Sequence, residues 1–256
     1  MFKFNRRTNV FEGLTAYLDE PEWYHSVHVL PLLAAMEKTD SKGVWPPKQR
    51  DKGLFRHLVW TLDEWSAFRS RGNLKDKRMA LRKALPSFCR EMRQRLLSSG
   101  AKCLASLSEK QAIDLGERLD SYFWKVGPKI KAEAGPSYVL PSKLGHLLFP
   151  EMVPAFDRAE IHDKVLEMLP ARMRRRKHYA TYFKLSWWIL QQFKDRGQLD
   201  EARQEVAEHL RQDWPIRVLR PRLPTMTARS LTRLDSFVSE YTLIGLVGMG
   251  ASFAHL

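Results

Sequence analysis

Cysteine is scarce in this sequence, which contains only Cys89 and Cys103. Two cysteines cannot build a disulfide framework or a zinc site of the multi-cysteine type, so we expect a protein of a reducing compartment, the cytoplasm. The first residues contain no apolar core of the length that a signal peptide needs. The apolar stretch Thr242–Leu256 is shorter than the roughly 18 residues of a membrane span. We therefore expect no transmembrane segment, and a buried final helix at this position.

Motifs that bind cofactors or metals are absent as well. The sequence has neither the Walker A spacing nor the dinucleotide-binding glycine pattern, and it has no nucleophile elbow. His25 and His28 would need further ligands to hold a metal ion. Glu160, His162 and Asp163 are close in sequence, but adjacent positions of a helix point in different directions. We therefore expect neither a metal site nor a cofactor.

Strand patterns are rare, and apolar residues recur instead at helical spacing. This periodicity predicts an all-α fold, a compact multi-helix domain with one or two helical subdomains. Residues 127–141 are rich in Gly, Pro and Lys and predict a connection between an N-terminal helical region, 1–126, and a C-terminal one, 142–256. Helices are expected over Asn9–Leu18, Glu22–Met36, Leu54–Ser66, Lys75–Ser99, Ser108–Val126, Ser142–Phe149, Arg158–Leu169, Tyr179–Arg196, Gln198–Gln212 and Ser230–Gly245.

Two local patterns refine these helices. Ser108 and Gln111 have the spacing of a capping box, which predicts a helix start. Pro86 lies inside the basic segment Lys75–Ser99 and predicts either two helices or one kinked helix.

The charge of the chain is strongly positive. Lys and Arg number 43 against 29 Asp and Glu, which gives a formal net charge of +14. Charge of this size says little about fold, but it favours polyanionic partners, and phosphate neutralisation with counterion release would supply much of the binding energy. A basic surface used for solubility or for an acidic protein is the plainer alternative.

Three groups of basic residues are candidates for phosphate contact. The densest precedes aromatic residues that fit core spacing better than a stacking role; it comprises Arg172, Arg174, Arg175, Arg176 and Lys177. The second extends over Arg69–Arg95 on more than one helical face and includes Lys75, Lys77, Arg78, Arg82 and Lys83. The third lies in a Pro-rich connector and consists of Arg217, Arg220 and Arg222, with Arg229 and Arg233 beyond it. Arginine suits bidentate phosphate contact.

The segment Leu140–Val165 combines a lysine at a helix start, an apolar helix, a Pro-bounded turn and then Asp157. Asp157 is placed to cap the helix that follows, and this structural role is the first interpretation. The segment also resembles the region around the catalytic aspartate of the helix-hairpin-helix DNA glycosylase superfamily. Val153-Pro154-Ala155-Phe156-Asp157 is similar to that family's "Val-Pro-x-Asp" turn, one residue longer, and Tyr241–Gly245 resembles its last packing helix.

This resemblance implies a glycosylase-like, helical C-terminal half, with Asp157 stabilising positive charge on a sugar and Lys143 as an amine nucleophile. A flipped base would then need an apolar or aromatic pocket. The sequence also departs from the family. Leu140-Pro141-Ser142 stands where the family has a glycine-rich hairpin, the Lys-to-Asp interval is shorter, and no four-cysteine cluster motif follows.

Our leading hypothesis is a DNA-binding protein that contacts mainly the phosphate backbone, in DNA repair, a mobile element or defence against foreign DNA. One alternative is an enzyme, a divergent base-excision glycosylase that uses Asp157. Another is a scaffold that binds other protein subunits of a larger assembly, which the eight tryptophans favour. Binding to a membrane surface through basic helices is a further option. Composition does not distinguish DNA from RNA, or single strands from duplexes.

Overall fold

The structure, a computed structural model, describes residues 9–19, 32, 52–65, 67–68, 74–131, 137–157, 165–166, 178–212 and 234–248. Over these residues the protein is all-α, as predicted, and contains no strand. The helices are α1 (Val10–Leu18), α3 (Lys52–Glu64), α4 (Leu74–Leu97), the 3-10 turn η1 (Leu104–Ser106), α5 (Glu109–Lys131), α6 (Val139–Leu148), α8 (His178–Asp195), α9 (Leu199–Gln212) and α11 (Asp235–Gly248). Among them, none combines the length and the apolar character that crossing a membrane demands.

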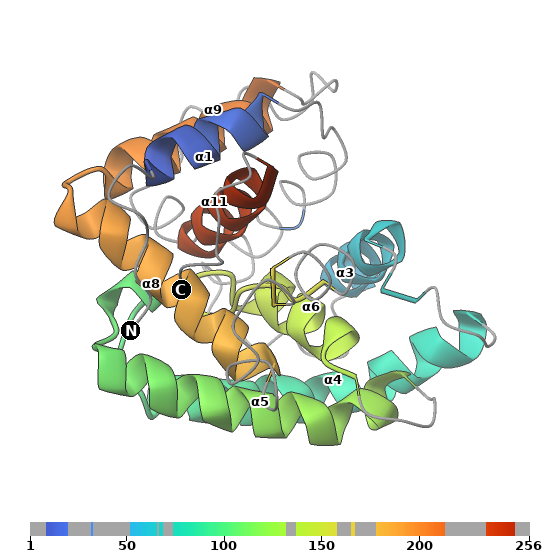
Figure 1. Cartoon of the computed structure of the whole chain (residues 1–256). Coiled ribbons are helices and arrows are strands. Elements are labelled where there is room, and N and C mark those ends of the chain that lie inside the picture. The colour runs from blue at the N-terminus through green and yellow to red at the C-terminus, as the bar shows by residue number, and fades with distance from the viewer. Residues whose placement is uncertain are drawn as a thin grey trace.

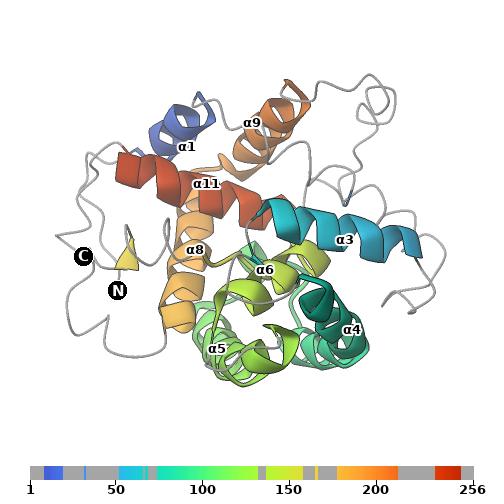
Figure 2. The same ribbon diagram turned by 90° about the vertical axis from the view of Figure 1, so that its right-hand side faces the viewer.

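The helices form two connected groups (Figure 1). Helices α1, α9 and α11 lie together at one end of the molecule, and the α4–α5 hairpin lies at the opposite end (Figures 1 and 2). Helix α8 runs between the two ends and contacts α5 at one end and α11 and α9 at the other. Helix α6 lies between α5 and α3, which it also contacts. The long α4–α5 hairpin therefore forms one end of the molecule, and α8 connects this hairpin to α9 and α11 at the other end.

The helix starts follow from local hydrogen bonds. The Asn9 side chain accepts a bond of 3.0 Å from the Phe11 backbone N–H and so caps α1. At the start of α5 the Ser108 backbone N–H donates to Gln111 Oε1 at 2.9 Å, and the Gln111 N–H donates back to Ser108 Oγ at 3.3 Å. This reciprocal pair is the predicted capping box. It satisfies two amides that the first turn of a helix leaves without partners.

Proline interrupts the helices less than expected. Helix α4 runs through Pro86 as one element, so the alternative of two separate helices is wrong. Helix α5 continues through Gly127 and Pro128 to Lys131, so the predicted connection at 127–141 is helical at its start, and α6 makes it helical again from Val139. A Cβ atom on Gly127 would lie 2.5 Å from the carbonyl oxygen of Ser137. Glycine fits the helix here because the returning chain passes directly over it.

The two halves of the chain share one core. Buried apolar side chains from all eight described α-helices form a single cluster, which includes Leu14, Leu58, Phe88, Leu144 and Phe237. Large rings occupy its centre, and Phe123 meets Tyr179 edge to face with 4.7 Å between ring centroids. The final helix is buried over much of its length, as its apolar sequence predicts. Predicted helices at Glu22–Met36 and Arg158–Leu169 lie largely outside the described residues.

A close approach between helices joins α1 to α11, two helices far apart in the sequence. Helices α1 and α11 touch where Gly13 faces Gly245, and a Cβ atom on Gly245 would overlap the backbone carbonyl of Gly13. A Cβ atom on Gly13 would meet the Leu246 side chain at 2.7 Å. Both positions therefore need glycine because the helix axes are too close for any side chain.

Replacing Gly245 with alanine should push α1 and α11 apart and lower the free energy of unfolding by at least about 3 kcal/mol. Urea denaturation followed by circular dichroism would measure the loss. Gly100→Ala is the matched control, since Gly100 has a φ of 69° and no atom within 4 Å of an added Cβ. That variant should lose only about 1–2 kcal/mol from backbone strain. An equal loss in both variants would contradict the close-packing account.

Candidate nucleic-acid interface

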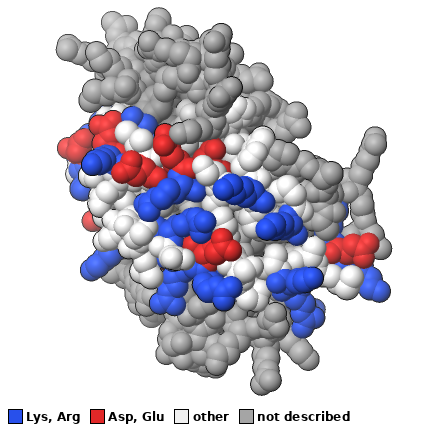
Figure 3. All heavy atoms as spheres, turned by 90° about the horizontal axis from the view of Figure 1, so that it is seen from below, with Lys and Arg blue, Asp and Glu red and all other residues white. Residues whose placement is uncertain are grey.

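The α4–α5 hairpin carries most of the exposed positive charge that the structure describes. Over residues 74–131, twelve Lys and Arg side chains are exposed or partly exposed, against five Asp and Glu. Figure 3 views the molecule from this side and shows Lys and Arg gathered over the middle of the face, with fewer acidic side chains. We call this surface the basic face. Its cations are Lys75, Arg78, Arg82, Lys83, Arg90, Arg93, Arg95, Lys102, Lys110, Arg118, Lys125 and Lys129.

Four of the five predicted α4 cations belong to the basic face: Lys75, Arg78, Arg82 and Lys83. Two of them are held by neighbours, since Arg78 forms a 3.2 Å ion pair with Asp63, and the Arg82 guanidinium lies 5.8 Å from the centre of the Phe55 ring. Lys77 is the exception. It is 2% exposed, and its Nζ donates a hydrogen bond of 3.1 Å to the Phe68 carbonyl oxygen. Its sequence position on α4 turns it inward, so it does not belong to the interface.

A groove of about 1040 Å³ runs between α4 and α5 on the basic face. The residues that line it are mostly of polar or charged type, although about half of the exposed lining surface is apolar: Gln94, Arg95, Ser98, Ser99, Gln111, Asp114, Glu117, Arg118, Ser121, Tyr122 and Lys125. Arg95 lies flat on the Tyr122 ring, with its guanidinium carbon 4.0 Å from the ring centre. Sequence analysis missed this groove, because nothing in the sequence shows that residue 95 lies beside residue 122.

Among the described residues, acidic side chains predominate on α9, at the end of the molecule opposite the basic face. Helix α9 exposes Asp200, Glu201, Glu205 and Glu208. Its described cation, Arg203, is bonded to Asp200 at 2.6 Å and to the buried Asp235 at 2.5 Å. In both Figure 1 and Figure 2, α9 and the α4–α5 hairpin lie at opposite ends. The charge of the described residues is therefore polarised along the molecule.

The other two predicted basic groups cannot be placed. Arg172, Arg174, Arg175, Arg176 and Lys177 lie outside the described residues, and so do Arg217, Arg220 and Arg222 with Arg229 and Arg233. The aromatics that follow the first group are described. Tyr182, Phe183, Trp187 and Trp188 are all buried, which agrees with their interpretation as core residues.

Lys143 and Asp157, the two residues that the family resemblance singles out, lie in direct contact. Lys143 Nζ donates to Asp157 Oδ2 at 2.5 Å and to the Trp65 carbonyl oxygen at 2.7 Å. The Lys143 side chain is 8% exposed and the Asp157 side chain 32%. The helix that Asp157 is predicted to cap lies outside the described residues. What the geometry provides is a buried ammonium group beside a carboxylate that solvent can reach.

The loop before Asp157 is attached to α6 by further polar contacts. Ser142 Oγ accepts a bond of 3.1 Å from the Phe156 backbone N–H. The His146 Nδ1–H donates to the Val153 carbonyl oxygen at 2.7 Å, and Tyr179 Oη donates to that of Pro154 at 3.0 Å. This loop and α6 are therefore one rigid unit around the Lys143–Asp157 pair.

Two buried carboxylates organise the helices around the basic face. Asp120 of α5 accepts hydrogen bonds from the backbone N–H groups of Tyr179 and Ala180, at 3.0 and 3.1 Å, and so caps α8. The Tyr138 hydroxyl adds a third bond to Asp120, at 3.2 Å. Burial raises the pKa of Asp120, although these three bonds act in the opposite direction. Sequence analysis missed this cap because the two partners are almost 60 residues apart.

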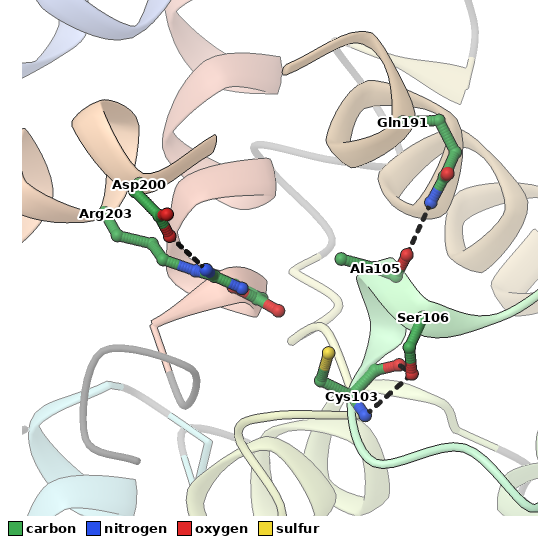
Figure 4. A network of polar contacts seen from close by, with 7 residues as sticks. Cys103, Ala105, Ser106, Gln191, Asp200 and Arg203 are labelled. Carbon is green, nitrogen blue, oxygen red and sulfur yellow. Dashed lines mark hydrogen bonds and ion pairs between the residues drawn. The ribbon is translucent and has the colours of Figure 1, made fainter. Parts of the chain in front are cut away.

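The second buried carboxylate, Asp235 at the start of α11, joins α9 to the turn between α4 and α5. Burial raises the pKa of Asp235, and Arg203 opposes this shift. Cys103, just before η1, lies beside it, and both burial and Asp235 raise the pKa of the Cys103 thiol. Figure 4 shows Arg203 and Cys103 on opposite sides of this cluster, and Gln191 of α8 donating to the Ala105 carbonyl at 2.9 Å. The hairpin turn is thus fixed to α8, α9 and α11.

Asp120→Asn should weaken the cap of α8 and lower the free energy of unfolding by about 1–3 kcal/mol under mildly acidic conditions. Because the folded-state pKa of Asp120 is raised above its ordinary value of 3.8, its favourable protonation is lost as pH rises through the folded pKa. The stability difference between the parent and the variant should therefore shrink as the pH rises from about 4 and passes through the folded-state pKa.

Urea denaturation across this pH range would measure the difference. The control is Asp114→Asn, an exposed position on the same helix, which should change stability by less than about 0.5 kcal/mol. A difference between Asp120→Asn and the parent that grows with pH would contradict the assignment of a raised pKa.

The described residues contain no group of three or more His, Cys, Asp and Glu that could hold a metal ion; His25, His28, Glu160, His162 and Asp163 lie outside them.

Comparison with known proteins does not help to identify the site. No family model, no curated protein and no solved structure matches this chain.

Proposed function

We propose that this protein binds nucleic acid, and DNA in the first place, through contacts of the basic face with the phosphate backbone. The observation that supports this proposal most is the concentration of twelve cations on the α4–α5 hairpin. So many like charges on one surface repel each other, and a polyanion relieves that repulsion. Six to ten phosphate contacts would give a loss of affinity of about 10³ to 10⁵ between low and physiological salt.

The separation of acidic and basic surfaces along the molecule favours one orientation of the protein toward nucleic acid. The acidic surface of α9 is repelled by phosphate, whereas the basic face at the other end is attracted. The field of the protein would therefore present the basic face during a diffusional encounter and increase the rate of productive association. An acidic protein surface is the alternative partner, which fits the scaffold hypothesis.

A role in DNA repair, in a mobile element or in defence against foreign DNA would suit such a protein, and we propose it as the biological setting. Contacts to phosphate position a protein without selecting a base sequence, which agrees with a surface made mostly of Lys and Arg.

Charge reversal on α4 tests the proposal. Lys83 and Arg90 are exposed and seven residues apart, so they lie on the same side of α4, two turns from each other. The double variant Lys83→Glu/Arg90→Glu should lower affinity for DNA at least about tenfold and make the salt slope shallower by about 1.8. Fluorescence anisotropy with a labelled oligonucleotide across a salt series measures both.

Lys194→Glu/Arg196→Glu is the matched control, because it makes the same change of net charge at exposed positions at the far end of α8. It should lose much less affinity than the α4 variant. Equal losses would mean that only net charge matters and that the basic face is not the interface. Micromolar or weaker binding of the parent to duplex DNA, single-stranded DNA and RNA at low salt would refute the proposal and favour a protein scaffold.

A second candidate function is base excision. The observation that favours it is the direct contact between Lys143 and Asp157, the amine and the carboxylate that a glycosylase of this type would use. Asp157 is one-third exposed, so a sugar could approach its carboxylate, which would stabilise positive charge developing there. Lys143 would first have to leave its partners and lose a proton before acting as a nucleophile. A purely structural ion pair fits the same contacts.

Asp157→Asn separates these two roles. If Asp157 is catalytic, excision of damaged bases from a duplex should fall by at least about 100-fold while thermal unfolding stays close to the parent. If the pair is structural, the parent shows no excision and the variant unfolds at a lower temperature, because the buried Lys143 ammonium loses its charged partner. An unchanged excision rate in a folded Asp157→Asn variant would rule out the enzymatic hypothesis for this site.

A further inference from the structure

We infer that the nucleic acid on the basic face is a single strand, whose backbone follows the groove between α4 and α5 and whose bases stack on Trp124. This inference rests on the proposed function and adds the form of the ligand to it. Two independent features support it: the small volume of the groove and the exposed ring of Trp124 beside it.

The groove is small. Its volume of about 1040 Å³ is close to that of sites which hold drug-sized ligands, about 300–1,000 Å³. It therefore suits a few nucleotides of one strand better than a duplex segment. The groove also contains hydroxyl and amide groups, from residues such as Ser98, Ser121 and Gln94, which suit phosphate and sugar oxygens.

The cations of the groove are already held in position. Arg95 lies on the Tyr122 ring and donates through Nη1 to the Glu91 carbonyl oxygen at 3.0 Å. Arg118 donates through Nη1 to Ser98 Oγ at 2.6 Å. Side chains that are ordered before binding lose less conformational entropy when a phosphate arrives.

The charged residues of the groove indicate which part of it the phosphate backbone would follow. Asp114 and Glu117 line the part of the groove nearer the start of α5, whereas Lys125 lines the part nearer its end, and Lys129 follows one turn later. Repulsion by the two carboxylates disfavours phosphate at the first part. The backbone is therefore expected to pass Arg95 and Arg118 and to continue toward Lys125 and Lys129.

Trp124 lies on the adjoining side of α5 and does not itself line the groove. It is 49% exposed, and its ring centroid lies 5.2 Å from that of Tyr138. Tyr138 is itself fixed by its hydrogen bond to Asp120, so Trp124 has a rigid support on one side. On α5, Trp124 is about 100° around the helix from Lys125 and about 60° from Ser121. A strand that leaves the groove over Ser121 therefore brings its bases to the Trp124 ring.

A base can reach an aromatic ring only when it is not paired and stacked within a duplex. Stacking of one base on an aromatic side chain contributes about 1–3 kcal/mol and depends little on sequence. The combination of a cationic groove with an exposed ring is the common arrangement for binding single strands without sequence preference. Helix α5 carries Trp124 and forms one wall of the groove, so the two features keep a fixed separation.

The test compares the full chain with the variants Trp124→Ala and Trp124→Phe on labelled oligothymidylate, oligouridylate and a duplex of matched length. The single strands should bind more tightly than the duplex at equal salt. Trp124→Ala should lower affinity for the single strands by about 5- to 150-fold, which is the stacking energy converted to affinity, and Trp124→Phe should retain part of it. Neither variant should alter the salt slope, because tryptophan carries no charge.

Trp60→Ala is the control, since Trp60 is 40% exposed on α3 and lies outside the groove. It should bind every oligonucleotide like the parent. A second variant, Arg118→Glu, should make the salt slope for single strands shallower by about 0.9. Thermal unfolding of each variant verifies the fold.

Equal or tighter binding of the duplex, or parental affinity in Trp124→Ala, would overturn this inference and leave duplex binding as the form of the proposed function. Preference for oligouridylate would support the single-strand inference and replace DNA by RNA as the ligand. Absence of salt-dependent binding to all three oligonucleotides would refute the proposed function itself, which is a different outcome.

Discussion

The need of buried polar groups for partners constrains this structure more than any other requirement. Helix α6 is buried on every side from Leu140 to Leu148, yet it carries Ser142, Lys143 and His146. Each of these side chains would cost free energy in an apolar core unless it found a hydrogen-bonding partner. The loop at 153–157 supplies those partners, and the Trp65 carbonyl adds one from the end of α3. The position of the loop, and with it the position of Asp157, follows from this requirement.

The same requirement explains how the base of the molecule is joined to the rest. Asp120 of α5 caps α8, and Asp235 of α11 bonds to Arg203 of α9 next to the turn that connects α4 with α5. Both carboxylates are buried, and both find their partners on other helices. The basic face is consequently built on a hairpin that is anchored at its turn and at the middle of α5, so the helices that carry its cations keep fixed positions relative to the rest.

The sequence predicts the helices well, because their signals are local. The capping box at Ser108 and Gln111, the cap at Asn9 and the apolar periodicity all act within a few residues. The prediction failed in part where a distant segment decides the outcome. Gly127 suggests a connection, but it lies inside α5, where the close passage of Ser137 requires a glycine. Lys77 suggests a surface cation, but the Phe68 carbonyl holds it inside.

The interface was predictable only as a tendency toward positive charge on α4. The groove, the support of Trp124 by Tyr138 and the contact of Arg95 with Tyr122 all depend on how α4, α5 and the start of α6 pack together. The contact between Lys143 and Asp157 was predictable in part. The family resemblance points to both residues, and they are only fourteen residues apart, so one helix and one loop can bring them together.

The state of the two cysteines has a practical consequence. Cys89 and Cys103 are both buried, burial raises the pKa of Cys89 to about 12, and burial with the nearby Asp235 raises that of Cys103. The thiolate is the reactive form, so both native cysteines are poor targets for alkylating reagents while the protein is folded. A cysteine introduced at an exposed site can therefore carry a fluorophore or spin label without removal of the native ones. Conversely, reaction of the native thiols reports directly on opening of the core.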